Sequence, residues 1–164
     1  MTDDAIVPMP PSEALEVIAR AIHEDYLASL AERDPAVPSH ADWDQLDERT
    51  RDLNRNQARD NVRKLWEQGI EVVVEVPPDA EVVEVLDDGA VEEMAKEEHR
   101  RWMAHRKAHG YEYGPVRSDD PADLRHPDIV PWSELSEEVR DKDRRPIRAF
   151  PGHLRAAGLA MVRR

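Results

Sequence analysis

Apolar side chains near the start of the chain recur at three- and four-residue intervals: Leu15, Ile18, Ala19, Ile22, Tyr26 and Leu30. Such spacing places them on one face of a helix, and Ser12 is a residue type that commonly precedes a helix. We therefore predict a helix over 13–32 with this face buried, preceded by a flexible lead-in of residues 1–11. Pro35 and Pro38 end the pattern, because proline cannot continue a helix.

A second helical pattern covers residues 46–68 and ends at Gly69, a residue type that readily closes helices. The period then becomes nearly alternating, with β-branched residues in two runs, 70–76 and 81–86. These runs predict two short strands, which pair either with each other as a hairpin or each with another segment. A further helix is expected over 90–108, with an inner face of Val91, Met94, Ala95, Glu98, Trp102 and Met103.

The segment 110–132 is polar and rich in glycine and proline, so we do not expect it to be helical. Connections of this length in a compact domain are usually functional or disordered, and its aromatic residues and prolines favour an ordered loop. Short helices are expected after it, then a bend bracketed by Pro146 and Pro151. A last helical turn at 153–157 and a closing strand at 159–162 complete the prediction.

The chain contains an internal repeat. Between 43–73 and 132–162, ten of the 31 aligned residues are identical without a gap. The upstream helices align at a different offset, with three matched pairs: Ala19 with Ala95, His23 with His99 and Tyr26 with Trp102. We infer a degenerate first copy over 12–86 and a second over 87–164. They are expected to pack as one compact domain, because each alone is too small to bury much surface.

The second copy carries motifs that resemble a known family. They are a helical His99-Arg100-Arg101-Trp102, the loop Gly110-Tyr111-Glu112-Tyr113-Gly114, the run His126-Pro127-Asp128-Ile129-Val130-Pro131, and a final Gly158-Leu159. In this order they resemble the ryanodine-receptor repeat, or RyR domain. The family's loop usually has tryptophan where this chain has Tyr111. The first copy lacks the Tyr-x-Tyr-Gly loop and has Ser39-His40 in place of His-Pro.

The resemblance implies a mainly α fold of the α+β class. It implies that two RyR-type repeats are related by a pseudo-twofold axis, and that short strands form a small antiparallel sheet. It also implies that the helix carrying His-x-x-Trp lines a cleft between the repeats, and that this cleft holds an adenine nucleotide.

Charge is distributed unevenly along the chain. Its net charge is −13, but residues 1–98 contribute −17 and residues 99–164 contribute +4. Acidic proteins bind polyanions poorly, so nucleic acid is not an expected partner, whereas the basic half suits a small anion. The chain has no apolar run long enough to cross a membrane, no secretory signal and no cysteine. We therefore expect a cytoplasmic location without membrane insertion.

Aromatic residues and histidines form the first set of candidate ligand contacts. Trp102 and Tyr26 occupy matching positions, and such a pair would sandwich a flat ring, with stacking worth about 1–3 kcal/mol per base. Burial in the core is the alternative for both. His99 and His23 lie one turn before them and would hydrogen-bond a base or a phosphate, or instead hold the loop.

Arginines are the best candidates for anion binding. Arg117 lies in the loop, and Arg144 lies one helical turn before Arg148, so each guanidinium is a candidate for a phosphate. Internal salt bridges with nearby acids are the alternative. Tyr111 and Tyr113, held on a proline-stiffened loop, would complete the wall of the site.

Catalysis has no support in the motifs of the chain. There is no cysteine nucleophile, no phosphate-binding glycine loop and no hydrolase motif. His105 and His109 have a spacing that suits a metal, but no third ligand lies at a convincing spacing. We predict no catalytic residue, no cofactor and no metal site.

These observations predict a sensor that binds a nucleotide-like small molecule, such as an adenine nucleotide, ADP-ribose or a cyclic nucleotide. An effector protein or a channel would be its partner in signalling. One alternative is a protein-interaction module whose acidic first half docks a basic partner. An enzyme acting on a nucleotide is a weaker alternative.

Overall fold

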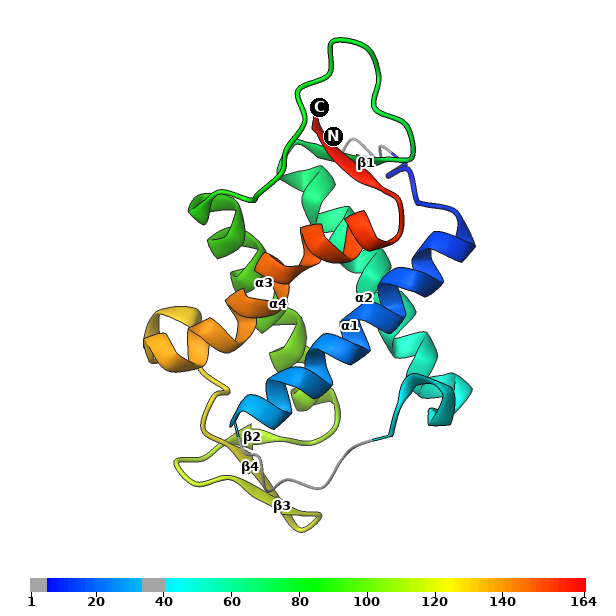
Figure 1. The fold of residues 1–164 in the computed structure, drawn as a ribbon. Coiled ribbons are helices and arrows are strands. Elements are labelled where there is room, and N and C mark those ends of the chain that lie inside the picture. Colours follow the sequence, from blue (N-terminus) through cyan, green and yellow to red (C-terminus); the bar gives the residue numbers. More distant parts are fainter. Residues whose placement is uncertain (1–5, 34–40) are drawn as a thin grey trace. The chain divides into compact units, whose positions relative to one another are not determined.

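Helices make up most of the computed structural model, which describes residues 6–33 and 41–164 (Figure 1). Within these residues the α-helices are α1 (Ser12–Arg33), α2 (Glu48–Glu67), α3 (Asp88–Ala108) and α4 (Glu137–Ala156). Two short 3-10 helices precede α2 and α4: η1 (Trp43–Gln45) and η2 (Trp132–Glu134). The predicted break at Pro35 and Pro38, the Ser39-His40 pair and the first five residues of the lead-in lie outside the described residues.

The strands are short and form two separate sheets. They are β1 (Ile70–Val73), β2 (Glu112–Tyr113), β3 (Ser118–Asp120), β4 (Asp123–His126) and β5 (Ala160–Arg163). One sheet pairs β1 with β5, and the other has the order β2-β4-β3. The predicted fold class, mainly helical with short strands, is therefore confirmed.

The chain forms two compact units, a first unit of Met1–Leu86 with Arg148–Arg164 and a second unit of Asp87–Ile147. Residues of α4 belong to both. The pseudo-twofold arrangement of two repeats in one compact domain stays a prediction. Among the helices of the described residues, none is both long and apolar enough to cross a membrane.

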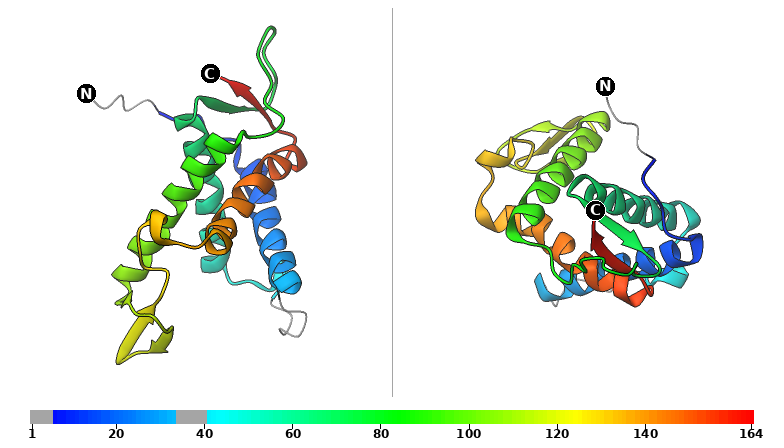
Figure 2. Two further views of the ribbon diagram at one scale, coloured as in Figure 1. Left: turned by 90° about the vertical axis from the view of Figure 1, so that its left-hand side faces the viewer. Right: turned by 90° about the horizontal axis from the view of Figure 1, so that it is seen from above.

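In the first unit, α1 and α2 lie side by side (Figures 1 and 2). Their buried apolar residues are Leu15, Ile18 and Ala19 on α1 and Ala58, Val62 and Leu65 on α2. The predicted inner face of α1 is therefore confirmed over its first half. It does not extend to Tyr26, which is 51% exposed, so helical spacing alone overestimated the length of the buried stripe.

The sheet of the first unit is antiparallel, with Glu71 opposite Val162. The predicted strand over 81–86 is wrong, because this segment makes only an isolated bridge between Val82 and Val162. Two backbone hydrogen bonds attach it to β5: Arg163 N–H to the Glu81 carbonyl at 2.8 Å and Val83 N–H to the Met161 carbonyl at 2.9 Å. The predicted closing strand is confirmed as β5.

The second unit contains a three-stranded sheet that was not predicted. In it, β2 is parallel to β4 and β3 is antiparallel to β4. All three strands lie in the segment that we expected to be a loop, and each is too short and too polar to show alternation. Gly114 is required there, since a Cβ atom at this position would lie 2.8 Å from the Cβ of Arg125.

The expected bend between Pro146 and Pro151 is also wrong, because α4 is one continuous helix. Each proline removes one main-chain donor from a helix. In α4 the tertiary structure overrides that local preference, and Pro151 itself is buried.

The internal repeat is reproduced element by element. α2 and α4 begin and end at positions 89 residues apart, and so do η1 and η2. Each long helix is followed by a glycine with positive φ, Gly69 at +75° and Gly158 at +76°. A glycine in the left-handed backbone conformation commonly ends a helix. Both copies therefore end the long helix in the same way before the strand begins.

Candidate functional site

An indole, an arginine and three carboxylates form a cluster in the second unit. The indole N–H of Trp132 donates to Glu92 at 2.9 Å, and Arg144 donates to both Glu92 oxygens at 2.9 and 3.2 Å. The Nη1 of Arg144 also bonds Glu137 at 2.7 Å and Asp141 at 3.0 Å. The guanidinium of Arg144 lowers the pKa of Glu92, and Glu92 in turn raises the pKa of Arg144.

The first unit repeats this cluster at the equivalent positions. Arg55 donates to both oxygens of Glu16, at 2.6 and 3.1 Å, and also to Glu48 and Asp52. The guanidinium lies 6.0 Å from the ring centroid of Trp43, as Arg144 lies 5.6 Å from that of Trp132. Two independent copies of one hydrogen-bonded frame indicate a structural role. A phosphate at Arg144 would have to displace one of three carboxylates.

The predicted histidines also have the same structural contact in both copies. The Nε2–H of His99 donates to the carbonyl of Val130 at 2.8 Å, and that of His23 donates to the carbonyl of Ala41 at 2.8 Å. His99 is only 2% exposed, and its Nδ1 lies 3.8 Å from Asp143. The bond to Val130 fixes the chain just before η2.

Trp102 lies in a row of rings in the second unit. Its ring centroid is 5.7 Å from His99, in a stacked arrangement, and 4.8 Å from His126, edge-on. The guanidinium of Arg106 lies 5.7 Å from the Trp102 centroid and 5.1 Å from that of Tyr111. A base that stacks on Trp102 would therefore compete with His99 or Arg106. Burial lowers the pKa of His126, which favours its neutral form.

The loop residues are linked through one carboxylate. The hydroxyl of Tyr111 donates to Asp119 at 2.7 Å, and Arg117 pairs with the same side chain at 3.2 Å. The bond from Tyr111 lowers the pKa of Asp119, and Asp119 raises the pKa of Tyr111. Tyr113, on β2, is 53% exposed.

The predicted site residues of the second unit thus fall into distinct surroundings. His99 and Trp102 are in contact, and Tyr111 and Arg117 meet at Asp119. Arg144 belongs to the Trp132 cluster instead. His23 and Tyr26 lie in the first unit, so their pairing with His99 and Trp102 around a ligand stays a prediction.

A groove of about 540 Å³ opens on the second unit beside Trp132. It is lined by Lys96, His99, Arg100, Met103, Pro131, Trp132 and Ser133. Arg100 is exposed and has no hydrogen-bond or ion-pair partner among the described residues. Lys96 makes one exposed pair with Glu93 at 3.3 Å. The groove therefore combines an indole, apolar side chains and an uncommitted guanidinium.

Sequence reasoning missed Arg100 and Lys96. The available signal was their spacing, since Lys96, Arg100 and Met103 fall at i, i+4 and i+7 on one helical face. The inner face predicted for this helix included Met103 but not the charged Lys96 and Arg100. Trp132 itself is partly exposed in the structure.

The equivalent positions of the first unit carry a net negative charge instead of a net positive one. Glu24 stands at the position of Arg100, and Asp42 and Asp44 stand at those of Pro131 and Ser133. Arg20, the equivalent of Lys96, is bonded to Glu24 at 2.9 Å. The hydrogen bond to Glu24 and then the charge of Asp44 raise the pKa of Arg20. The same backbone frame thus presents a basic face in one copy and an acidic face in the other.

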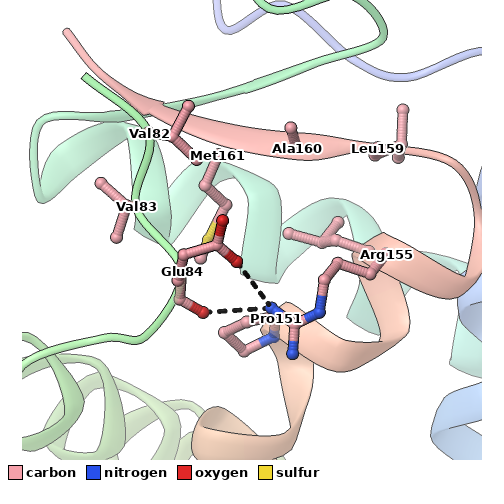
Figure 3. A pocket seen from close by; sticks show the side chains of 9 residues that line it. Val82, Val83, Glu84, Pro151, Arg155, Leu159, Ala160 and Met161 are labelled. Carbon is pink, nitrogen blue, oxygen red and sulfur yellow. Dashed lines mark hydrogen bonds and ion pairs between the residues drawn. The ribbon is translucent and has the colours of Figure 1, made fainter.

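A smaller cavity of about 90 Å³ lies in the first unit, between β5, the end of α4 and the segment 82–84 (Figure 3). Its walls are largely apolar, and Arg155 donates to the Glu84 carbonyl at 3.1 Å beside it. Nucleotide sites have volumes of about 300–1,000 Å³, so this cavity is too small for such a ligand.

Metal ligands do not converge in the part of the chain that the structure describes. Within residues 6–33 and 41–164, no three side chains of the ligand types His, Cys, Asp and Glu are grouped so that they could hold an ion. The rings of His105 and His109 are 4.3 Å apart, and Nδ1 of His109 donates to the carbonyl of His105 at 2.8 Å. That nitrogen carries the donated proton and therefore cannot bind a metal ion in this arrangement.

Comparison with known proteins gives one family. The family model of the RyR domain matches residues 80–163, slightly more than half of the chain. The match includes the groove and the Trp132 cluster. No curated protein matches the chain.

Proposed function

The chain belongs to the RyR domain family, and from this premise we propose that its second unit binds a nucleotide-like small molecule in the groove beside Trp132. The observation that carries the proposal is Arg100, an exposed guanidinium without a partner among the described residues, at the edge of a groove of ligand size. Uncommitted guanidinium groups suit phosphates, because their planar donors form paired hydrogen bonds.

The groove offers each part of such a ligand a suitable contact. Its volume of about 540 Å³ falls in the range of small-molecule sites. Trp132 and Met103 supply surfaces for a flat ring, and stacking of this kind contributes about 1–3 kcal/mol per base. Lys96 adds a second positive charge on the same helix face as Arg100.

The other predicted contacts support binding less well. Arg144 is bonded to three carboxylates, and Trp102 is not among the residues that line the groove, whereas Trp132 is. We therefore place the phosphate at Arg100 and the ring against Trp132. Adenine nucleotides, ADP-ribose and cyclic nucleotides all have this combination of ring and phosphate.

Calorimetry with these three ligand classes tests the proposal. Arg100→Ala is expected to weaken binding by at least about tenfold, since a charge-assisted contact is worth roughly 1.5–3 kcal/mol. Arg20→Ala is the matched control, an exposed arginine on the equivalent helix of the first unit, and should leave affinity unchanged.

Arg117→Ala distinguishes this groove from the loop around Arg117, which the sequence predicts as part of the ligand site. Loss of binding in Arg117→Ala with normal binding in Arg100→Ala would move the site to Asp119 and its neighbours. Absence of heat with all three ligands at millimolar concentration would refute nucleotide binding altogether.

A further inference from the structure

A loop of residues 74–86, here called the finger, projects from the β1–β5 sheet of the first unit (Figures 1 and 2). Its tip is a turn closed by a hydrogen bond from Ala80 N–H to the Pro77 carbonyl at 3.2 Å. Pro78 fixes one central φ of this turn, and Asp79 takes the left-handed φ of +64° at the next position. Pro77 and Pro78 restrict the backbone at the turn, and the β-bridge at Val82 attaches the second arm to β5.

The finger exposes aliphatic side chains that a folded protein ordinarily buries. Val85 is 79% exposed and Val74 is 61% exposed, and Val76 and Val82 are each more than two-fifths exposed. Both arms contribute, with Val74 and Val76 before the turn and Val82 and Val85 after it. Exposed apolar residues concentrated in one short segment are typical of interaction sites.

The same segment is unusually acidic. No lysine, arginine or histidine occurs between Lys64 and Lys96. The side chains of Glu71, Glu75, Asp79 and Glu81 have no partner among the described residues. Their charges therefore remain available to a cation from outside this part of the chain.

The small cavity described above lies at the base of the finger. Figure 3 shows Val82 and Val83 on one side, Met161 and Ala160 on β5 with Leu159 just before it, and Pro151 on α4. At about 90 Å³, it has room for one aliphatic side chain. A peptide that runs along the finger would place an anchor in this cavity.

We propose that the finger and the cavity at its base form a docking surface for a basic, aliphatic segment of a partner protein. Lysine or arginine residues of that segment pair with Glu75 and Glu81, and its aliphatic residues contact the exposed valines. Charge complementarity selects this occupant, because the segment 65–95 carries only negative charges. The preset turn favours binding, since little of the finger has to be ordered on contact.

The probe is a labelled octapeptide of alternating lysine and leucine, titrated with the full chain by fluorescence anisotropy. Two double variants test the two kinds of contact, Val82→Ser with Val85→Ser and Glu75→Gln with Glu81→Gln. Each is expected to weaken binding by at least about tenfold, and added salt should weaken binding to the wild type. The control is Val116→Ser with Glu134→Gln, which changes the same residue types on exposed positions of the second unit.

Three results would overturn the proposal. They are absence of binding at about 1 mM protein, equal binding by all variants, and equal binding of a glutamate–leucine peptide. Sedimentation provides a further outcome. If the wild-type chain forms a dimer and the valine double variant does not, the occupant of this surface is a second copy of the chain. None of these measurements depends on nucleotide binding, so either proposal can be refuted without the other.

Discussion

At the residue scale, the two copies share a hub in which one arginine binds carboxylates from two helices. Arg144 connects Glu92 on α3 with Glu137 and Asp141 on α4. Arg55 does the same for α1 and α2 in the first unit. Such a hub fixes helix orientation more firmly than isolated surface pairs, because several charges share one planar group.

Glu92 should make stability depend on pH. Its folded-state pKa is lowered from the ordinary 4.5 by the hydrogen bonds from Arg144. A lowered folded pKa gives stability that is fully present above the unfolded value and is lost as pH falls through the folded value. We expect Glu92→Gln to lower the unfolding midpoint near pH 7, and the difference from wild type to shrink progressively below pH 4.5.

Urea denaturation at a series of pH values measures this effect. Glu138→Gln is the control, since Glu138 is exposed on α4 and has no partner among the described residues. A difference between Glu92→Gln and wild type that is the same at pH 3 and pH 7 would show that the charge of Glu92 contributes nothing.

At the element scale, α4 and α2 have the same length although their sequences differ in helix propensity. α2 has ordinary helix-forming residues throughout, whereas α4 contains Pro146 and Pro151 at the positions of Gln57 and Val62. Proline in a helix interior costs about 3 kcal/mol relative to alanine. The buried side chains of Ile147, Phe150 and Leu154 offset this cost and hold the helix together.

Pro146→Gln should therefore stabilise the protein. Pro146 is exposed, so its replacement restores a main-chain donor without loss of packing. We expect an increase of about 2 kcal/mol in the free energy of unfolding, after subtracting the roughly 0.4–1 kcal/mol by which proline restricts the unfolded chain. Pro151→Val is the comparison and should gain less, because its buried ring is also lost. An unchanged or lower denaturation midpoint in Pro146→Gln contradicts this account.

At the scale of the whole molecule, the two copies of the internal repeat are frames of opposite net charge. The bond from histidine to a carbonyl, the tryptophan and the arginine hub recur in both copies. The helix face beside the tryptophan does not, since Arg100 is replaced by Glu24 and Ser133 by Asp44. The second copy thus has a surface that suits anions, and the first copy has a surface that repels them.

If the groove binds a nucleotide as proposed, the chain should bind one ligand and not two. Isothermal titration should give one site per chain for the wild type. Glu24→Arg with Asp44→Ser is expected to create a second, weaker site, provided that circular dichroism shows an intact fold. Two equivalent sites in the wild type would show that the charge difference does not govern binding.

The sequence was informative where a physical signal is local. Hydrophobic spacing located α1, α2 and α3, and Gly69 and Gly158 marked helix ends. It failed at the strands over 112–126, because two to four polar residues carry no period. It also failed at the prolines of α4, where packing prevails over propensity.

The site was predicted only in part for a related reason. Residue types suggested His99, Trp102, Arg117 and Arg144 as ligand contacts, but a residue type does not reveal which partner already occupies it. Folding bonds His99 to Val130 and Arg144 to three carboxylates, and it leaves Arg100 without a partner among the described residues.

The sequence by itself determined the family, the mainly helical class, the identities between its two halves and the separation of charge between them. These follow from residue identity and spacing, which do not require knowledge of contacts. Tertiary structure alone decided which polar groups satisfy one another and which valines stay in water. Those outcomes depend on neighbours that lie up to tens of residues apart in the chain and come together only when it folds.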